Sequence, residues 1–166
     1  MTLKYKLIIT IGISIMITWS SLQLLKPKIS IYNNTRHNIY IYFGESTYGV
    51  DPSVEEVDKI IKRRPDELMP GQKIMLKPSL KRLLANDSEV GIGWYVGGQY
   101  AYNSISTSGQ LFKLSKQEGN CSISIHINND KTLLNQSAKG ICYQKLLPFK
   151  QVYGVDYPTH YREDNS

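Results

Sequence analysis

The longest apolar run of the chain covers residues 7–25, which contain no charged side chain and are flanked by lysines on both sides. Nineteen helical residues extend over about 28 Å, close to the hydrocarbon thickness of a bilayer. The run therefore predicts a transmembrane or signal helix, either retained as an anchor or cleaved near Ser20. Lys4 and Lys6 precede it and favour a cytoplasmic N-terminus, with the rest of the chain outside the cytoplasm.

Beyond Pro27 the pattern changes to the apolar and polar alternation that is typical of half-buried strands. Residues 29–43 contain two such runs around an Asn-Asn-Thr turn, which predicts a hairpin or one long bent strand. A strand is expected over residues 72–78. In the tyrosine-rich segment that follows, Gly97-Gly98 predicts a two-residue hairpin turn, since such turns require positive φ. More strands are expected at 110–114 and on both sides of a turn at 128–131.

One amphipathic helix is predicted between Asp51 and Arg64. Ser53 and Glu56 have the spacing of a capping box, and Pro65 ends the helix because the residue before proline avoids the α region. Its apolar stripe consists of Val54, Val57, Ile60 and Ile61. With one such helix and seven or eight strands, the expected fold is mainly β and β-sandwich-like, or α+β.

Three regions are expected. Residues 1–25 form the signal anchor or signal peptide, residues 26–150 a mainly-β extracytoplasmic domain, and residues 151–166 a polar tail. A length of 166 residues leaves room for one folded domain of this kind.

The chain has two cysteines, Cys121 and Cys142, at the facing ends of the predicted strand pair around residues 128–131. Outside the cytoplasm they can form a structural disulfide, which would stabilise the fold by about 3 kcal/mol. Two cysteines and three scattered histidines do not provide a four-ligand zinc site. We expect no metal, cofactor or catalytic residues. The nucleophile-elbow motif is absent and adjacent carboxylates diverge, so the chain is not expected to be an enzyme.

The positive charge is concentrated in one stretch. The whole chain has 20 Lys and Arg against 14 Asp and Glu. Residues 59–82 contain eight basic and two acidic residues, a local net charge of +6. The eight are candidate partner-binding residues: Lys59, Lys62, Arg63, Arg64, Lys73, Lys77, Lys81 and Arg82. They suit an acidic protein surface, anionic lipid headgroups or cell-wall phosphates, or form a solvated helix end that complements the helix dipole. Nucleic acid is not an expected partner, because no binding motif accompanies the charge.

Residues 49–78 resemble the second half of a LysM module, in which a helix precedes a Pro-Gly-Gln turn and an apolar strand. The matching positions are Gly49, Val50, Val57, Ile61, Leu68, Pro70, Gly71, Gln72, Ile74 and Leu76. This resemblance implies binding to the N-acetylglucosamine of peptidoglycan or chitin.

The overall organisation resembles that of the small periplasmic immunity proteins of Gram-negative interbacterial antagonism, such as those paired with type VI secretion effectors. The shared features are Lys4, Lys6, the export segment at 7–25 and the cysteines Cys121 and Cys142. The resemblance implies a non-enzymatic protein that binds and occludes a toxin. It would be held in the inner membrane by residues 7–25 with its C-terminal domain in the periplasm, or secreted there after cleavage near Ser20. Small envelope components of secretion or pilus systems have the same organisation and are an alternative.

Overall fold

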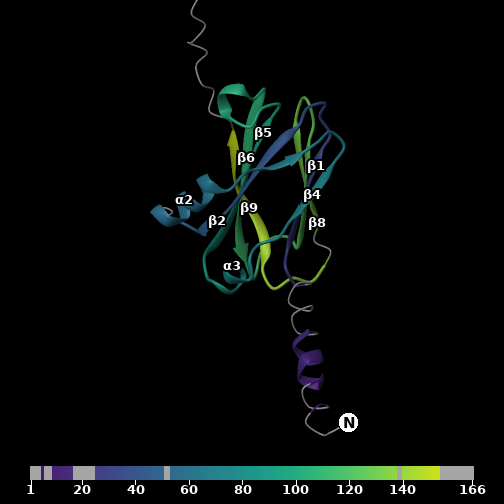
Figure 1. The fold of residues 1–166 in the computed structure, drawn as a ribbon, viewed down its shortest axis with the longest axis vertical. Coiled ribbons are helices and arrows are strands. Elements are labelled where there is room, and N and C mark those ends of the chain that lie inside the picture. The colour runs from purple at the N-terminus through teal and green to yellow at the C-terminus, as the bar shows by residue number, and fades with distance from the viewer. Residues whose placement is uncertain (1–4, 6–8, 17–24, 51–52, 138–139, 154–166) are drawn as a thin grey trace, which may run out of the picture.

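A computed structural model describes residues 5, 9–16, 25–50, 53–137 and 140–153. Most of the described chain forms two β-sheets that lie side by side with their inner faces together (Figure 1). The architecture is therefore mainly β and sandwich-like, as the alternation of apolar positions predicts.

The four-stranded sheet has the strand order β4-β1-β7-β8. Its strands are β1 (Lys28–Asn33), β4 (Lys73–Leu76), β7 (Ser122–Ile127) and β8 (Thr132–Ser137). β1 pairs in parallel with β7, whereas the β1–β4 and β7–β8 pairs are antiparallel. The β7–β8 hairpin and the strand at β4 confirm two of the sequence predictions.

The five-stranded sheet is antiparallel throughout and has the order β3-β2-β5-β6-β9. Its strands are β2 (Ile39–Thr47), β3 (Asp66–Leu68), β5 (Ser88–Val96), β6 (Ser106–Ser115) and β9 (Lys145–Tyr153). β9 continues three residues into the segment for which the sequence predicts a tail. The rest of that segment, residues 154–166, lies outside the described residues.

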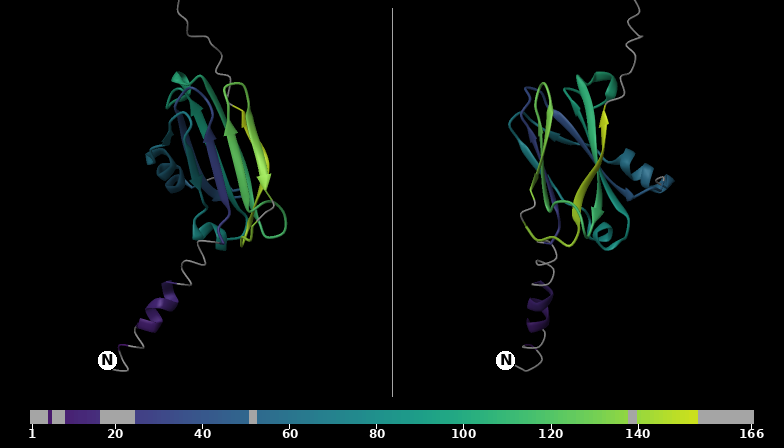
Figure 2. Two further views of the ribbon diagram at one scale, coloured as in Figure 1. Left: turned by 90° about the vertical axis from the view of Figure 1, so that its right-hand side faces the viewer. Right: turned by 180° about the vertical axis from the view of Figure 1, so that it is seen from behind.

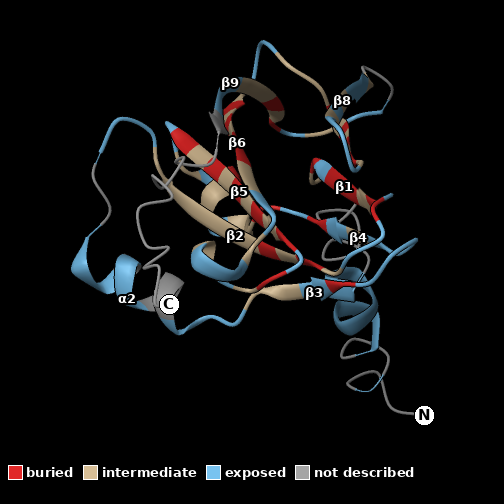
Figure 3. Ribbon diagram, turned by 90° about the horizontal axis from the view of Figure 1, so that it is seen from above, coloured by how far each residue is buried: buried red, intermediate tan, exposed pale blue. Residues whose placement is uncertain are grey.

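One hydrophobic core fills the space between the sheets, where Figure 3 shows the buried residues gathered on the facing sides. The four-stranded sheet contributes isoleucines at alternate positions, including Ile29, Ile31 and Ile123, all fully buried. The five-stranded sheet contributes larger side chains such as Phe112 and Trp94. Because successive strand residues point to opposite faces, every second position of these strands remains on the outside.

Residues 29–43 form neither the predicted hairpin nor one long bent strand. β1 and β2 belong to different sheets, so the polar turn between them carries the chain across the sandwich. The buried Asn33 side chain fixes this crossing, since its Nδ2 donates to the carbonyls of His37 and Leu68, both at 2.8 Å. Period-two alternation correctly identifies the buried isoleucines on both strands, but it carries no information on which strands pair.

The predicted two-residue turn at Gly97-Gly98 is also wrong, although β5 and β6 do pair as neighbours. Residues 97–105 form a longer connection that includes a 3₁₀ helix, η1 (Ala101–Asn103). The Tyr100 amide donates to Asn103 Oδ1 at 2.8 Å, and Ile105 N donates to Val96 O at 2.8 Å to close the connection. These contacts stabilise a compact loop where the sequence predicts a second strand.

Two short α-helices complete the domain. α2 (Val54–Lys62) ends before Pro65, as predicted, and projects from the side of the molecule in both views of Figure 2. Val54 is 86% exposed and Val57 is 38% exposed, so these stripe residues do not join the core. α3 (Leu80–Leu84) is capped by Ser79, whose side chain accepts a hydrogen bond from the Arg82 amide.

The structure confirms the predicted disulfide between Cys121 and Cys142. At the N-terminal end, residues 9–16 are helical. No helix in the described part of the chain is long and apolar enough to cross a membrane. Most of the predicted membrane segment at 7–25, including the cleavage position near Ser20, lies outside the described residues.

Candidate functional site

The outer face of the five-stranded sheet carries a strip without side chains. Gly44 pairs with Gly91 between β2 and β5, and Gly93 pairs with Gly109 between β5 and β6. All four glycines line one cavity of about 480 Å³, which we call the glycine trough. Cavities of this size hold small ligands or single side chains of a partner.

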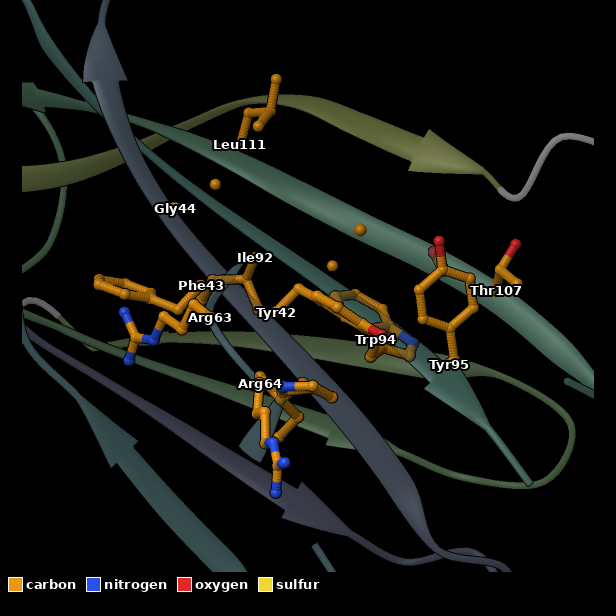
Figure 4. A pocket seen from close by; sticks show the side chains of 16 residues that line it. Tyr42, Phe43, Gly44, Arg63, Arg64, Ile92, Trp94, Tyr95, Thr107 and Leu111 are labelled. Carbon is orange, nitrogen blue, oxygen red and sulfur yellow. The ribbon is translucent and has the colours of Figure 1, made fainter. Parts of the chain in front are cut away.

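Larger side chains surround the strip of glycines, as Figure 4 shows. Leu111 lies at one end, and Tyr95 lies with Thr107 at the other. Arg63 and Arg64, in the segment that joins α2 to β3, also line the cavity. The trough therefore combines a floor of backbone with aromatic, aliphatic and cationic walls.

The backbone does not require glycine at two of these positions. Gly91 and Gly93 lie within β5 and have no positive φ. A Cβ on Gly93 would contact Tyr42 Cβ at an ordinary 3.9 Å, and one on Gly91 would lie 3.0 Å from Leu111 Cδ2. Glycine inside a strand weakens it, since no side chain packs and more backbone entropy is lost. Gly93 therefore leaves space above the sheet, whereas the Leu111 side chain already lies over Gly91.

Tyr42 forms a rigid side wall of the trough. Its hydroxyl donates to the carbonyl of Gln99 at 2.7 Å, and its ring meets that of Tyr95 edge to face at 5.2 Å. Burial, and then the neighbouring phenols of Tyr95 and Tyr100, raise the pKa of Tyr42 above its ordinary value. Tyr42 therefore stays neutral and keeps its hydrogen bond throughout the physiological pH range.

A second cavity, of about 510 Å³, lies beside the trough, and we call it the basic groove. Five cationic side chains line it: Lys26, Arg63, Lys77, Lys81 and Arg82. Glu45 is the one carboxylate in the lining, and its Oε1 already accepts a hydrogen bond from the Ser79 amide at 2.6 Å. The groove therefore has a strong excess of positive charge.

The cations of the groove differ in how they are held. Arg82 is anchored, because it donates to Thr47 Oγ1 at 3.0 Å and to the Glu45 carbonyl at 3.5 Å. Lys26, Lys77 and Lys81 have no carboxylate within salt-bridge distance among the described residues. Unpaired lysines of this kind remain available to an anionic ligand.

The trough and the groove join. Phe43, Gly44 and Arg63 line both cavities, so one ligand can extend from one into the other. The Arg63 guanidinium lies 5.7 Å from the centre of the Phe43 ring and 3.9 Å from Asp66. A cation held over an aromatic ring at the junction offers both apolar and electrostatic contact.

The structure brings together some of the eight predicted partner-binding residues and separates others. Arg63, Lys77, Lys81 and Arg82 line the groove, and Arg64 lines the trough. Lys59 and Lys62 belong to α2, where Lys62 pairs with Asp58 at 2.6 Å. Lys73 lies on β4 of the other sheet, over the ring of Tyr32 at 5.0 Å. Charge density along the sequence does not reveal this separation.

Sequence reasoning missed Lys26 and the four glycines. Lys26 follows the apolar run at 7–25, so its position in the sequence indicates only a flank of the membrane segment. The glycines had a recognisable signal, because Gly91 and Gly93 occupy alternate positions of one strand and therefore share a face. In combination with a glycine on each neighbouring strand, that spacing marks a depression in the sheet.

Within the described residues, no group of three or more His, Cys, Asp or Glu side chains could hold a metal ion. The ring of His126 stacks on the ring of Tyr32, with 4.4 Å between the ring centres, on the outer face of the four-stranded sheet.

Comparisons with protein-family models, curated proteins and solved structures found no match for this chain.

Proposed function

We propose that this chain is a non-enzymatic, extracytoplasmic protein-binding module that captures an acidic segment of a partner protein in its basic groove. The main support for the proposal is that five cationic residues line one cavity, and that the single carboxylate in its lining is already hydrogen-bonded. These cations come from separate elements, since Lys26 precedes β1, Arg63 follows α2, and α3 supplies Lys81 and Arg82.

A solvated helix end does not explain this arrangement. Cations that only complement a helix dipole lie in the last turn of that helix and point into water. Here Lys26 and Lys77 belong to neither helix, and both border the same cavity as α3. Grouped like charges repel one another, so such a cluster is best explained by an anionic ligand that relieves the repulsion.

A protein partner fits the site better than a free anion. The groove continues into the glycine trough, and together they offer an extended surface with charged, aromatic and apolar parts. The disulfide supports an oxidising compartment, as expected for an exported domain. Within this proposal, an immunity-type inhibitor that occludes a toxin is the specific role we favour.

We predict that reversing two groove lysines, Lys77→Glu with Lys81→Glu, weakens binding of an acidic peptide at least about tenfold, because attraction becomes repulsion. Neither lysine has a carboxylate partner among the described residues, so the fold should be retained. The measurement is fluorescence anisotropy of a labelled Glu-Asp repeat peptide, with the full-length chain in neutral detergent.

The matched control is Lys73→Glu with Lys131→Glu, which changes the net charge equally but lies away from the groove. The control variant should keep most of the affinity of the native chain for the peptide. Salt should weaken its binding as much as it weakens binding by the native chain. Equal losses in the two double variants would mean that only overall charge matters, and would contradict a binding groove.

A further inference from the structure

We propose that the glycine trough is the receptor for an aromatic side chain of the partner, carried next to the acidic residues that occupy the basic groove. This inference rests on the proposed function and adds the kind of sequence that the groove recognises. The ligand is thus an acidic peptide segment with an embedded aromatic residue.

The floor of the trough suits a flat ring. Gly44, Gly91, Gly93 and Gly109 bring no side chain to this cavity on three adjacent strands, and Gly109 itself is buried. Amide groups inside a sheet are engaged in the hydrogen-bonded ladder, so the floor offers flat contact area and few free polar groups.

The walls offer contacts that distinguish aromatic from aliphatic side chains. Tyr42 and Tyr95 already meet edge to face, so a third ring can extend the aromatic cluster. Arg63 and Arg64 line the same cavity, and a guanidinium stacks favourably over an aromatic ring. The Tyr42 hydroxyl is held by Gln99, so this wall is already ordered before a ligand binds.

The junction of the two cavities determines how close the aromatic residue of the ligand lies to its acidic residues. Phe43, Gly44 and Arg63 belong to both linings, so a ring in the trough and carboxylates in the groove would lie in adjacent cavities. Five cations line the adjoining groove, so charge complementarity favours acidic residues next to the aromatic residue in the ligand. Aromatic anchors in pockets next to charged contacts are typical of residues that dominate binding energy at interfaces.

The test uses two fluorescein-labelled peptides, Glu-Asp-Trp-Asp-Glu and Glu-Asp-Ala-Asp-Glu, and the full-length chain in neutral detergent, with protein-free micelles as the blank. We expect the native chain to bind the tryptophan peptide about tenfold more tightly. Gly93→Val should remove that preference by lowering the affinity for the tryptophan peptide. Valine suits a strand, and its Cβ would meet only ordinary contacts.

Ser124→Val, on the outer face of β7 in the other sheet, is the matched control and should keep the tryptophan preference. Equal binding of the two peptides to the native chain would overturn the trough proposal while leaving the groove intact. A tryptophan preference that survives Gly93→Val would overturn it as well. If neither peptide binds the native chain, the proposed function itself fails.

Discussion

Replacement of Asn33 by alanine is expected to lower the free energy of unfolding by about 3 kcal/mol. The Asn33 side chain is fully buried and makes four hydrogen bonds. Its Nδ2 donates to His37 O and Leu68 O, and its Oδ1 accepts from the amide and the hydroxyl of Thr35. Alanine would leave these groups without Asn33 as their partner inside the protein, at a cost of about 1–3 kcal/mol for each one left unsatisfied.

The adjacent Asn34 is a natural control for this prediction. Asn34 is exposed, and its Nδ2 contacts Asn128 Oδ1 at 3.1 Å and His126 Nδ1 at 3.4 Å. Asn34→Ala should therefore change the free energy of unfolding by only about 0.5 kcal/mol. Urea denaturation of both variants measures the difference. Similar small effects for the two would mean that the buried network does not hold the crossing between the sheets.

Loss of the Cys121–Cys142 disulfide should also cost about 3 kcal/mol, because the bond closes a loop of about 22 residues in the unfolded chain. The bond lies next to the start of β1, since Lys28 N donates to Cys121 O, and Tyr143 N donates to Leu25 O. Reduction should therefore weaken attachment of residues 25–28 in addition to lowering global stability.

The measurement is urea denaturation of the native chain with and without a thiol reductant. A variant with both cysteines replaced by alanine should match the reduced chain and should not respond to reductant. A reduced chain as stable as the oxidised one would show that packing alone fixes this end of the sandwich.

Local signals in the sequence predicted the elements well. The inward isoleucines followed from alternation, and the end of α2 followed from Pro65, because both depend on residues close together in the chain. Strand partners could not be predicted in the same way. β1 pairs with β7, nearly a hundred residues away, and this choice depends on tertiary packing that alternation does not encode.

The part of the candidate site formed by residues close together in the chain was also predictable from the sequence. Lys77, Lys81 and Arg82 stand close together in the sequence and remain together in space. Lys73 belongs to the same stretch, but β4 places it on the other sheet. Lys26 joins the groove from about fifty residues away in the chain, and the trough is formed by three strands. These contributions become visible only when the strand register is known.

The proposed immunity-type role implies that the acidic partner captured by the basic groove is a toxin encoded beside this chain, and binding to that protein is the most direct measurement. Titration calorimetry of that protein with the full-length chain should give 1:1 binding. The affinity should fall at least about tenfold for the Lys77→Glu, Lys81→Glu variant and little for the Lys73→Glu, Lys131→Glu control. Binding of undiminished affinity by the groove variant would contradict the account.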